Sequence, residues 1–322
     1  MEHGTTLGDW SPSYARRTKG IVARDLAPLH DVRVDELSVS DVEALIERRQ
    51  KGGASPNTIR LMRNALSAAI NLAIRRELLS PWANVAGRAQ APTVRREAPH
   101  YIPPELVPAF IDGLADERFR VLILTAMTLA LRPSEGIGLL WSDIDLDKRE
   151  LTIRGSVQYE GKSYVRRDRP KDEEPRTIAM PAFLADLLRE HRKEQMVERQ
   201  ADYADIAPMP LRTPAMVRKA DLARQRHDER RQRRKVHDAA WPGLVFTSRD
   251  GGPVYEAGVN RRLALIIDQI NRARQEPKLG VAPEPLPPVT FYQLRHTGAR
   301  GCCRRESRSM SFRRSWGTHR PP

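Results

Sequence analysis

The feature that most constrains the fold is a stretch, residues 83–103, in which hydrophobic periodicity stops. It is basic and interrupted by prolines, which lack an amide donor and end helices. A chain of 322 residues is long enough for two domains, at roughly 100–200 residues each. The sequence therefore predicts four parts: a first domain over 1–82, a linker over 83–103, a second domain over 104–300 and an arginine-rich tail over 301–322.

The first domain is predicted to be a bundle of three to four helices. One helix is predicted to start at a capping box of Ser40 and Glu43 and to end at Gly52-Gly53. The next runs from Ser55-Pro56 to Ser80-Pro81. Its apolar side chains recur every three or four residues, as on one face of a helix: Ile59, Met62, Leu66, Ala69, Ile70, Ala73 and Ile74.

The second domain mixes helical and alternating patterns. Helices are predicted over 104–114, 118–131, 181–200 and 256–274. Short alternating runs near 151–157, 164–165 and 177–180 predict a small antiparallel sheet, with a further short strand at 244–247. Residues 201–240 are charged and poor in large aliphatic side chains, and we interpret them as an exposed insertion or a flexible arm. The fold class is therefore mainly α with a small antiparallel β-sheet, that is, α+β.

The charge favours a polyanionic partner. The chain carries 55 Lys and Arg against 41 Asp and Glu, a net charge of +14. Residues 212–237 contain ten of the basic residues and three acids. Nucleic acid is the first candidate partner, although solvated helix faces explain such runs equally well.

Several classes of protein are excluded by simple patterns. The chain has no apolar run of 18 residues and no signal-like N-terminus, so we expect neither a membrane span nor secretion. Its two cysteines, Cys302 and Cys303, are adjacent, which is a poor geometry for a disulfide. We expect a cytoplasmic protein without a disulfide framework or a zinc site.

Three separated segments carry residues suited to phosphate chemistry. The first is Leu-Arg-Pro-Ser-Glu at 131–135, followed by Trp-Ser-Asp-Ile-Asp at 141–145. The second is Lys171 with Arg-Thr-Ile at 176–178, and the third is Tyr-Gln-Leu-Arg-His-Thr at 292–297. Behind the helical bundle and in this order, they resemble the arginine box, the lysine-bearing β-hairpin and the His-x-x-Arg box of the tyrosine recombinase (phage integrase) family. The helix that starts at Ser55 resembles that family's core-binding domain.

The resemblance implies a site and a mechanism. Arg132 and Arg295 would hold the scissile phosphate, because a guanidinium stays charged and presents paired donors. Lys171 would protonate the leaving 5′ oxygen. Tyr292 stands where the family usually has His; a phenol can donate a hydrogen bond, but with a pKa of about 10 it is a poor proton shuttle. No metal or other cofactor is implied.

The resemblance also implies an architecture and partners. A core-binding domain and a catalytic domain would form a C-shaped clamp on double-stranded DNA, and four copies would assemble for strand exchange in a nucleoid-associated, cytoplasmic protein. Thr58, Arg60 and Arg63 are candidate contacts to DNA phosphates, but an exposed helix face explains them equally well. Without the resemblance, Arg132 is explained by capping of the preceding helix, Lys171 by a solvated turn, and Tyr292 by packing in the core.

The chain departs from the family after Ala299. No tyrosine follows Tyr292, whereas the family's nucleophile lies near the C-terminus and forms a 3′-phosphotyrosine. In a shifted reading frame, residues 304–321 admit codons for a Leu-Gly-His peptide, and we hypothesise a frame shift near residue 300. The predicted function is thus site-specific DNA recombination or integration of a phage or mobile element, by a chain that is catalytically incomplete. The alternative is a non-catalytic DNA-binding remnant or a decayed integrase product.

Overall fold

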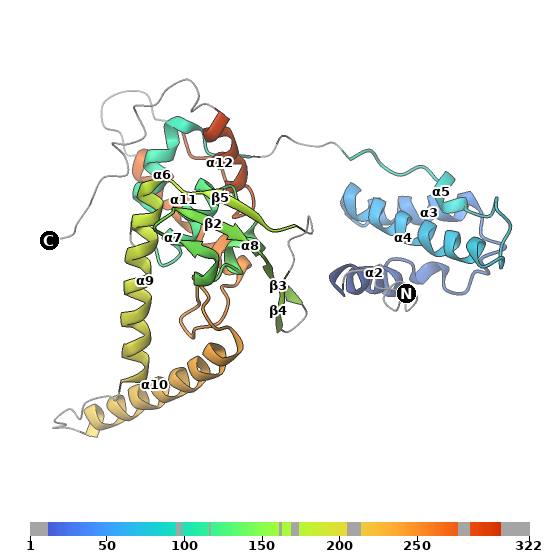
Figure 1. The fold of residues 1–322 in the computed structure, drawn as a ribbon. Helices are drawn as coiled ribbons and strands as arrows, with labels where there is room; N and C mark the ends of the chain where they lie inside the picture. The colour runs from blue at the N-terminus through green and yellow to red at the C-terminus, as the bar shows by residue number, and fades with distance from the viewer. Residues whose placement is uncertain are drawn as a thin grey trace. The chain divides into compact units, whose positions relative to one another are not determined.

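The chain has two compact units, Met1–Ala98 (unit 1) and Pro99–Pro322 (unit 2). A computed structural model describes the following residues, shown in colour in Figure 1: 12–94, 98, 100–115, 117–160, 163–168, 174–204, 214–275 and 284–303. The boundary between the units lies inside the stretch predicted as a linker. The arginine-rich run 304–322, with its hypothesised frame shift, lies outside the described residues.

Unit 1 is helical, as its sequence predicts. Helix α4 (Pro56–Arg75) packs against the other three helices, and its buried side chains Ile59, Met62 and Ile70 form the centre of the core. Ser55 caps α4, since its hydroxyl accepts a hydrogen bond from the Thr58 amide. The remaining elements of this unit are α2 (Pro12–Arg24), the 3-10 turn η1 (Ala27–Leu29), α3 (Val39–Lys51) and α5 (Val85–Arg88).

The structure corrects the predicted start of one helix in this unit and the predicted end of the next. The capping box of α3 is formed by Ser38 and Asp41, two residues before the predicted pair, with the two reciprocal hydrogen bonds present. Glu43 instead accepts a hydrogen bond from the Gln90 amide. Helix α4 ends at Arg75, because the chain turns at Glu77, whose φ is 59°.

The predicted linker, residues 83–103, is too long at both ends. Val85, Ala86 and Ala89 are buried against unit 1, so α5 belongs to that unit's core. At the other end Ile102 is buried in unit 2. The burial of short apolar side chains is a tertiary effect, and the proline content of the stretch does not reveal it.

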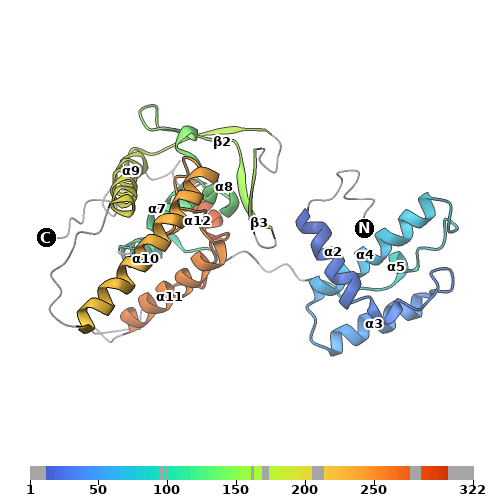
Figure 2. The same cartoon turned by 90° about the horizontal axis from the view of Figure 1, so that it is seen from below.

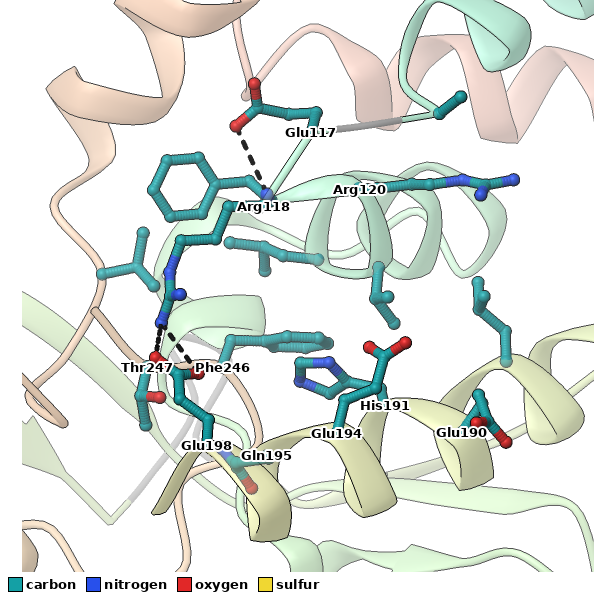
Figure 3. A pocket seen from close by; sticks show the side chains of 16 residues that line it. Glu117, Arg118, Arg120, Glu190, His191, Glu194, Gln195, Glu198, Phe246 and Thr247 are labelled. Atoms are coloured by element: carbon teal, nitrogen blue, oxygen red, sulfur yellow. Dashed lines mark hydrogen bonds and ion pairs between the residues drawn. The ribbon is translucent and has the colours of Figure 1, made fainter. Parts of the chain in front are cut away.

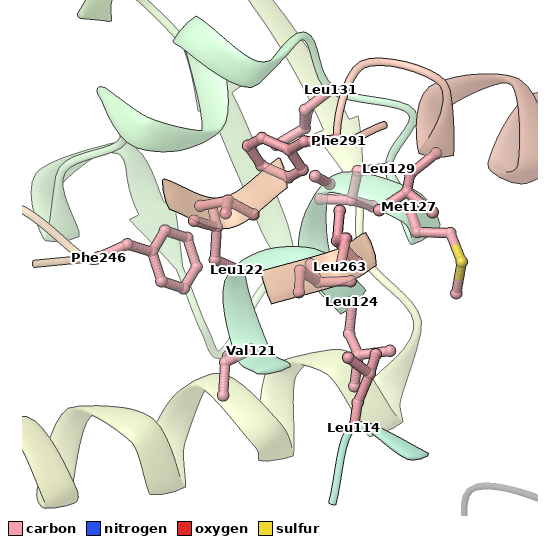
Figure 4. Packing of buried hydrophobic residues seen from close by; sticks show 14 of the residues in the cluster. Leu114, Val121, Leu122, Leu124, Met127, Leu129, Leu131, Phe246, Leu263 and Phe291 are labelled. Atoms are coloured by element: carbon pink, nitrogen blue, oxygen red, sulfur yellow. The ribbon is translucent and has the colours of Figure 1, made fainter. Parts of the chain in front are cut away.

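Unit 2 is built around α7 (Arg120–Thr128), an apolar helix buried over most of its length. Helices α9 (Ala182–Tyr203) and α12 (Leu294–Cys303) pack against it, as does the short α8 (Pro133–Ile137). Figure 4 shows the α7 side chains Leu122, Leu124 and Met127 within a buried cluster that includes Phe246, Leu263 and Phe291. The other helical elements are η2 (Pro104–Leu106), α6 (Val107–Gly113), η3 (Trp141–Asp143), α10 (Pro214–Ala240) and α11 (Glu256–Gln275), of which α11 packs on α6.

The strands of unit 2 form two small antiparallel sheets rather than one. In the three-stranded sheet, β2 (Glu150–Ile153) lies between β1 (Ile144–Asp145) and β5 (Arg176–Ala179). The register places Leu151 opposite Ile178, which buries the Leu151 side chain. A separate hairpin pairs β3 (Ser156–Glu160) with β4 (Ser163–Arg167). The α+β fold class is confirmed, and no described helix is long and apolar enough to cross a membrane.

The described part of the charged segment 201–240 is mostly helical and partly buried. Residues 214–240 form the single long helix α10, which Figures 1 and 2 show next to the end of α9. Arg234 of α10 is fully buried. A low content of large aliphatic residues predicts exposure, but a buried ion pair replaces an apolar core here.

Candidate active site

The first part of the site is a buried carboxylate shared by two arginines. The Glu135 side chain in α8 is 2% exposed. Its carboxylate accepts hydrogen bonds from the Arg132 amide and from Nη1 of Arg132, both at 2.9 Å. Nη2 of Arg176, the first residue of β5, donates to the same carboxylate at 2.7 Å. Two arginines that are 44 positions apart in sequence are thus joined through one acid.

The backbone explains why Arg132 lies at this place. Helix α7 ends at Thr128, and Ala130 takes a left-handed conformation with φ of 50°. The chain then passes through the extended Arg132 and enters α8 at Pro133, which suits the first position of a helix. Arg132 therefore directly precedes a new helix, and its guanidinium pairs with Glu135 of that helix.

The two arginines keep Glu135 ionised. Burial by itself raises the pKa of a carboxyl group, because the charged form loses hydration. For Glu135 the hydrogen bonds from Arg176 and Arg132 outweigh this effect, so its pKa lies below the ordinary value. The outcome is a fixed negative charge that holds two guanidinium groups in place.

The second part of the site is the segment that leads into α12. Thr290 and Gln293 exchange hydrogen bonds at its start, and the Phe291 amide donates to Oδ1 of Asn260 at 2.7 Å. The Phe291 ring lies against Gly136 of α8, at 4.0 Å from the position of a Cβ built on that glycine. The segment therefore packs directly on the helix that holds Glu135.

Arg295 lies within this segment, at the start of α12. One turn further along, Gly298 contacts the backbone of Met127 at the end of α7. Packing on α7 and on α8 brings Arg295 to the same end of α7 that Arg132 follows. The Nη1 atom of Arg295 is buried and has no hydrogen-bond partner among the described residues. A buried guanidinium donor without a partner is costly, and such a group is suited to an anionic ligand.

Tyr292 belongs to the surface rather than to the core. Its side chain is 51% exposed, so the packing interpretation of this tyrosine is wrong. Its ring stands edge-on to that of His296, with 5.9 Å between the ring centres. Two groups able to donate hydrogen bonds thus lie beside Arg295.

The remaining candidates fall in three places. Lys171 lies outside the described residues, although the strand that follows it begins with Arg176, which contacts Glu135. In unit 1, both Thr58 and Arg60 contact their own helix start, through Ser55 and Asn57. Arg63 donates to the backbone carbonyls of Ala86 and Gly87, and so ties α4 to α5.

Two residues of the site were not picked out as functional from the sequence. Arg176 appears there only as part of a motif, and Asn260 not at all. For Arg176 the signal is its position at the start of a predicted strand after the Lys171 motif. For Asn260, which positions Phe291, the sequence carries no signal, because the contact joins residues 31 positions apart.

A separate cavity of about 440 Å³ lies between α7 and α9. Glu190, Glu194 and Glu198 of α9 line this cavity, and Figure 3 shows the Arg118 side chain reaching Glu198, with which it pairs at 3.0 Å. Burial lowers the pKa of His191 in its wall. None of the predicted site residues that the structure describes lines this cavity. The described residues contain no group of three or more His, Cys, Asp or Glu able to hold a metal ion.

Comparison with known proteins gives two sequence relatives and a shared fold. The chain is 23% identical over 188 residues to a tyrosine recombinase XerC-like protein of Caldanaerobacter subterraneus, covering 53% of this chain and 47% of that protein. It is 26% identical over 171 residues to the prophage integrase IntZ of Escherichia coli, covering 50% and 40% respectively. The matched regions thus span less than half the length of these relatives. No family model matches the chain.

The fold agrees with these relatives. The structure of the Tn1549 transposon integrase, in complex with transposon right end DNA, superposes with a TM-score of 0.66 at 15% identity. The match covers 98% of this chain and 87% of that one. The two sequence relatives support the resemblance to the tyrosine recombinase family, and the fold is similar to that of a transposon integrase.

Proposed function

We propose that the chain binds duplex DNA as a site-specific recombinase of a phage or mobile element, with one DNA phosphate held between Arg132 and Arg295. The observation that carries this proposal is the buried Nη1 of Arg295, which has no hydrogen-bond partner among the described residues and lies at the same end of α7 as Arg132. The DNA complex of the Tn1549 integrase, whose fold the chain shares, supports DNA as the ligand.

In the proposed site each group has a different task. Glu135 fixes Arg132 and Arg176, so these guanidinium groups need no reorganisation when a phosphate arrives. Arg295 contributes paired donors to the non-bridging oxygens, where charge grows as the phosphate is attacked. Tyr292 donates a hydrogen bond from the open side. Lys171, by the family resemblance, protonates the leaving 5′ oxygen.

The covalent step needs a tyrosine, and Tyr292 is the last one in these 322 residues. A single side chain would then be both nucleophile and phosphate ligand. A second candidate function is that these residues bind DNA without cutting it. In either case the partner is duplex DNA, and the protein is cytoplasmic and associated with the nucleoid. Four copies assemble only if strand exchange occurs.

The test starts from duplexes selected for binding out of a random-sequence library. Binding is measured by gel shift, and a nicked version of a selected duplex is then examined on a denaturing gel for a covalent protein–DNA band. A shift without a covalent band is the expected result and supports the second function. A band that disappears in Tyr292→Phe identifies that tyrosine as the nucleophile, and failure to shift any duplex overturns the proposal.

A further inference from the structure

The α9–α10 arm is fixed at its base by a buried ion pair. Nη1 of Arg234 lies 2.7 Å from Oδ2 of Asp202, and the two side chains are only 2% and 1% exposed. Arg230 pairs with the other carboxylate oxygen of Asp202. Burying charges costs free energy, and the best attested use of such pairs is to specify one geometry. The pair therefore sets the direction in which α10 leaves unit 2.

A loop closes over the same base. Gly251, at φ of +85°, lies so near Arg234 that a Cβ there would be 3.1 Å from its side chain. A Cβ on Gly252 would lie 2.8 Å from the His237 ring. On the α9 side, the Tyr203 hydroxyl donates to Oδ2 of Asp238 at 2.7 Å. Contacts on two sides therefore hold the base of α10 in one position.

The far part of α10 has no such support. Between Met216 and Arg226, Ala220 is the only residue that is not exposed. The helix has 27 residues, which corresponds to a length of about 40 Å. Figures 1 and 2 both show it as a long helix extending well past the end of α9. An exposed helix end gains little from packing, and a partner on its surface would supply the missing stabilisation.

The basic residues of α10 are not spread evenly around it. Lys219, Arg226 and Arg233 are spaced seven apart, so they share one side of the helix at intervals of about 10.5 Å. Lys219 and Arg226 are exposed and have no ion-pair partner within the described part of the chain, while Arg233 is 3.7 Å from Asp250.

The opposite flank of α10 carries charges of both signs. It carries Arg224 and Lys235, but Asp221 and Asp228 lie on the same flank, each within one turn of Arg224. An anion approaching this flank meets two carboxylates. The seven-spaced side has one such acid, Glu229, which accepts a hydrogen bond from Gln225, and three basic residues, so it is the better surface for a polyanion.

We propose that the Lys219–Arg226–Arg233 side of α10 binds the phosphate backbone of duplex DNA, beyond the segment held by Arg132 and Arg295. The proposal rests on the proposed DNA-binding function. A straight row of about 21 Å matches a duplex, which is stiff over that distance, better than a flexible strand. Single strands are commonly bound by stacking on aromatic side chains, and α10 contains no Phe, Tyr or Trp.

The experiment compares two double variants of the full chain that lose the same charge from the same helix. Lys219→Gln/Arg226→Gln removes two members of the row, and Arg224→Gln/Lys235→Gln removes two residues from the opposite flank. Affinity for a labelled 40-base-pair duplex of mixed sequence is measured by fluorescence anisotropy between 50 and 300 mM KCl. The slope of log K against log salt counts the phosphates neutralised, at about 0.9 per contact on a duplex.

We expect the first variant to lower this slope by about 1.8 and the second to leave it nearly unchanged. Equal effects would mean diffuse attraction without a contact surface and would overturn the proposal. So would an unchanged slope in both variants with normal duplex binding, which would leave the proposed function standing. A change of oligomeric state in size-exclusion chromatography, without a change of slope, would assign this face to a second copy of the chain. Loss of all duplex binding by the unmodified chain would instead contradict the proposed function.

Discussion

Gly298 lies so close to Met127 that a Cβ on the glycine would be 1.7 Å from the Met127 carbonyl oxygen. Only a residue without a side chain allows α12 to approach the end of α7 at this distance. The approach is functional as well as structural, because it brings the segment with Arg295 to the end of α7 that Arg132 follows. The glycine that follows the third motif thereby brings Arg295 of that motif to the end of α7 that Arg132 follows.

We expect Gly298→Ala to separate α12 from α7 and to lower the free energy of unfolding of unit 2 by about 3 kcal/mol or more. Urea denaturation followed by circular dichroism measures this. Gly258→Ala in α11 is the matched control, since a Cβ there meets only the Tyr255 ring at 3.9 Å. The control should be neutral or stabilise by about 0.5–1 kcal/mol. Equal stability of the two variants would contradict the close approach.

Removal of the shared carboxylate should affect both stability and DNA binding. Glu135→Ala leaves the half-buried Arg132 and Arg176 without their common acceptor, and we expect a loss of about 3 kcal/mol in the free energy of unfolding. Glu135→Gln keeps one acceptor oxygen and should lose less. Chemical denaturation of the two variants at pH 7 tests the order, and a larger loss in the glutamine variant would refute it.

The same residue predicts a pH dependence. Because the pKa of Glu135 is lowered in the folded chain, its ionised form stabilises the fold above the ordinary value of 4.5. This contribution disappears as the pH falls through the lower, folded value. The stability difference between the unmodified chain and Glu135→Gln should therefore be constant above about pH 6 and shrink below about pH 4.5. A difference that grows on acidification would rule out an ionised Glu135.

Arg295 should show opposite effects on binding and on stability. Its Nη1 lacks a partner within the described residues, so Arg295→Met removes a costly buried donor and should leave stability unchanged or raise it. The same variant should weaken binding to a selected duplex about tenfold or more, because charged hydrogen bonds to phosphate are lost. Thermal denaturation and anisotropy provide the two measurements. Loss of stability together with affinity would point to a purely structural arginine.

The buried pair at the base of α10 lends itself to a double-mutant cycle. Arg234→Met leaves Asp202 buried with only Arg230 beside it, and we expect a loss of about 3 kcal/mol. The double variant Arg234→Met/Asp202→Leu removes both charges and should recover most of that loss. Urea denaturation of the single and double variants gives the coupling energy. Additive effects would show that the two residues act independently.

Local patterns were enough to predict much of this protein. Apolar side chains spaced three and four apart fixed α4 and α11, because one-sided burial requires that period. The alternation of apolar and polar residues predicted β2 and β5. The order of the three motifs indicated the family resemblance without knowledge of any contact. The glycines after α3 and the Ser55-Pro56 start of α4 were also predicted correctly, since capping depends on a few neighbouring residues.

The tertiary structure decided what depends on residues far apart in the chain. The sequence shows Arg132, Arg176 and Arg295, but it does not show that Glu135 holds the first two or that the third has an unpartnered donor. It marks 201–240 as charged, yet the burial of Arg234 against Asp202 arises only when α9 and α10 meet. Hydrophobic period and capping are local, whereas desolvation and ion pairing depend on which groups the fold brings together.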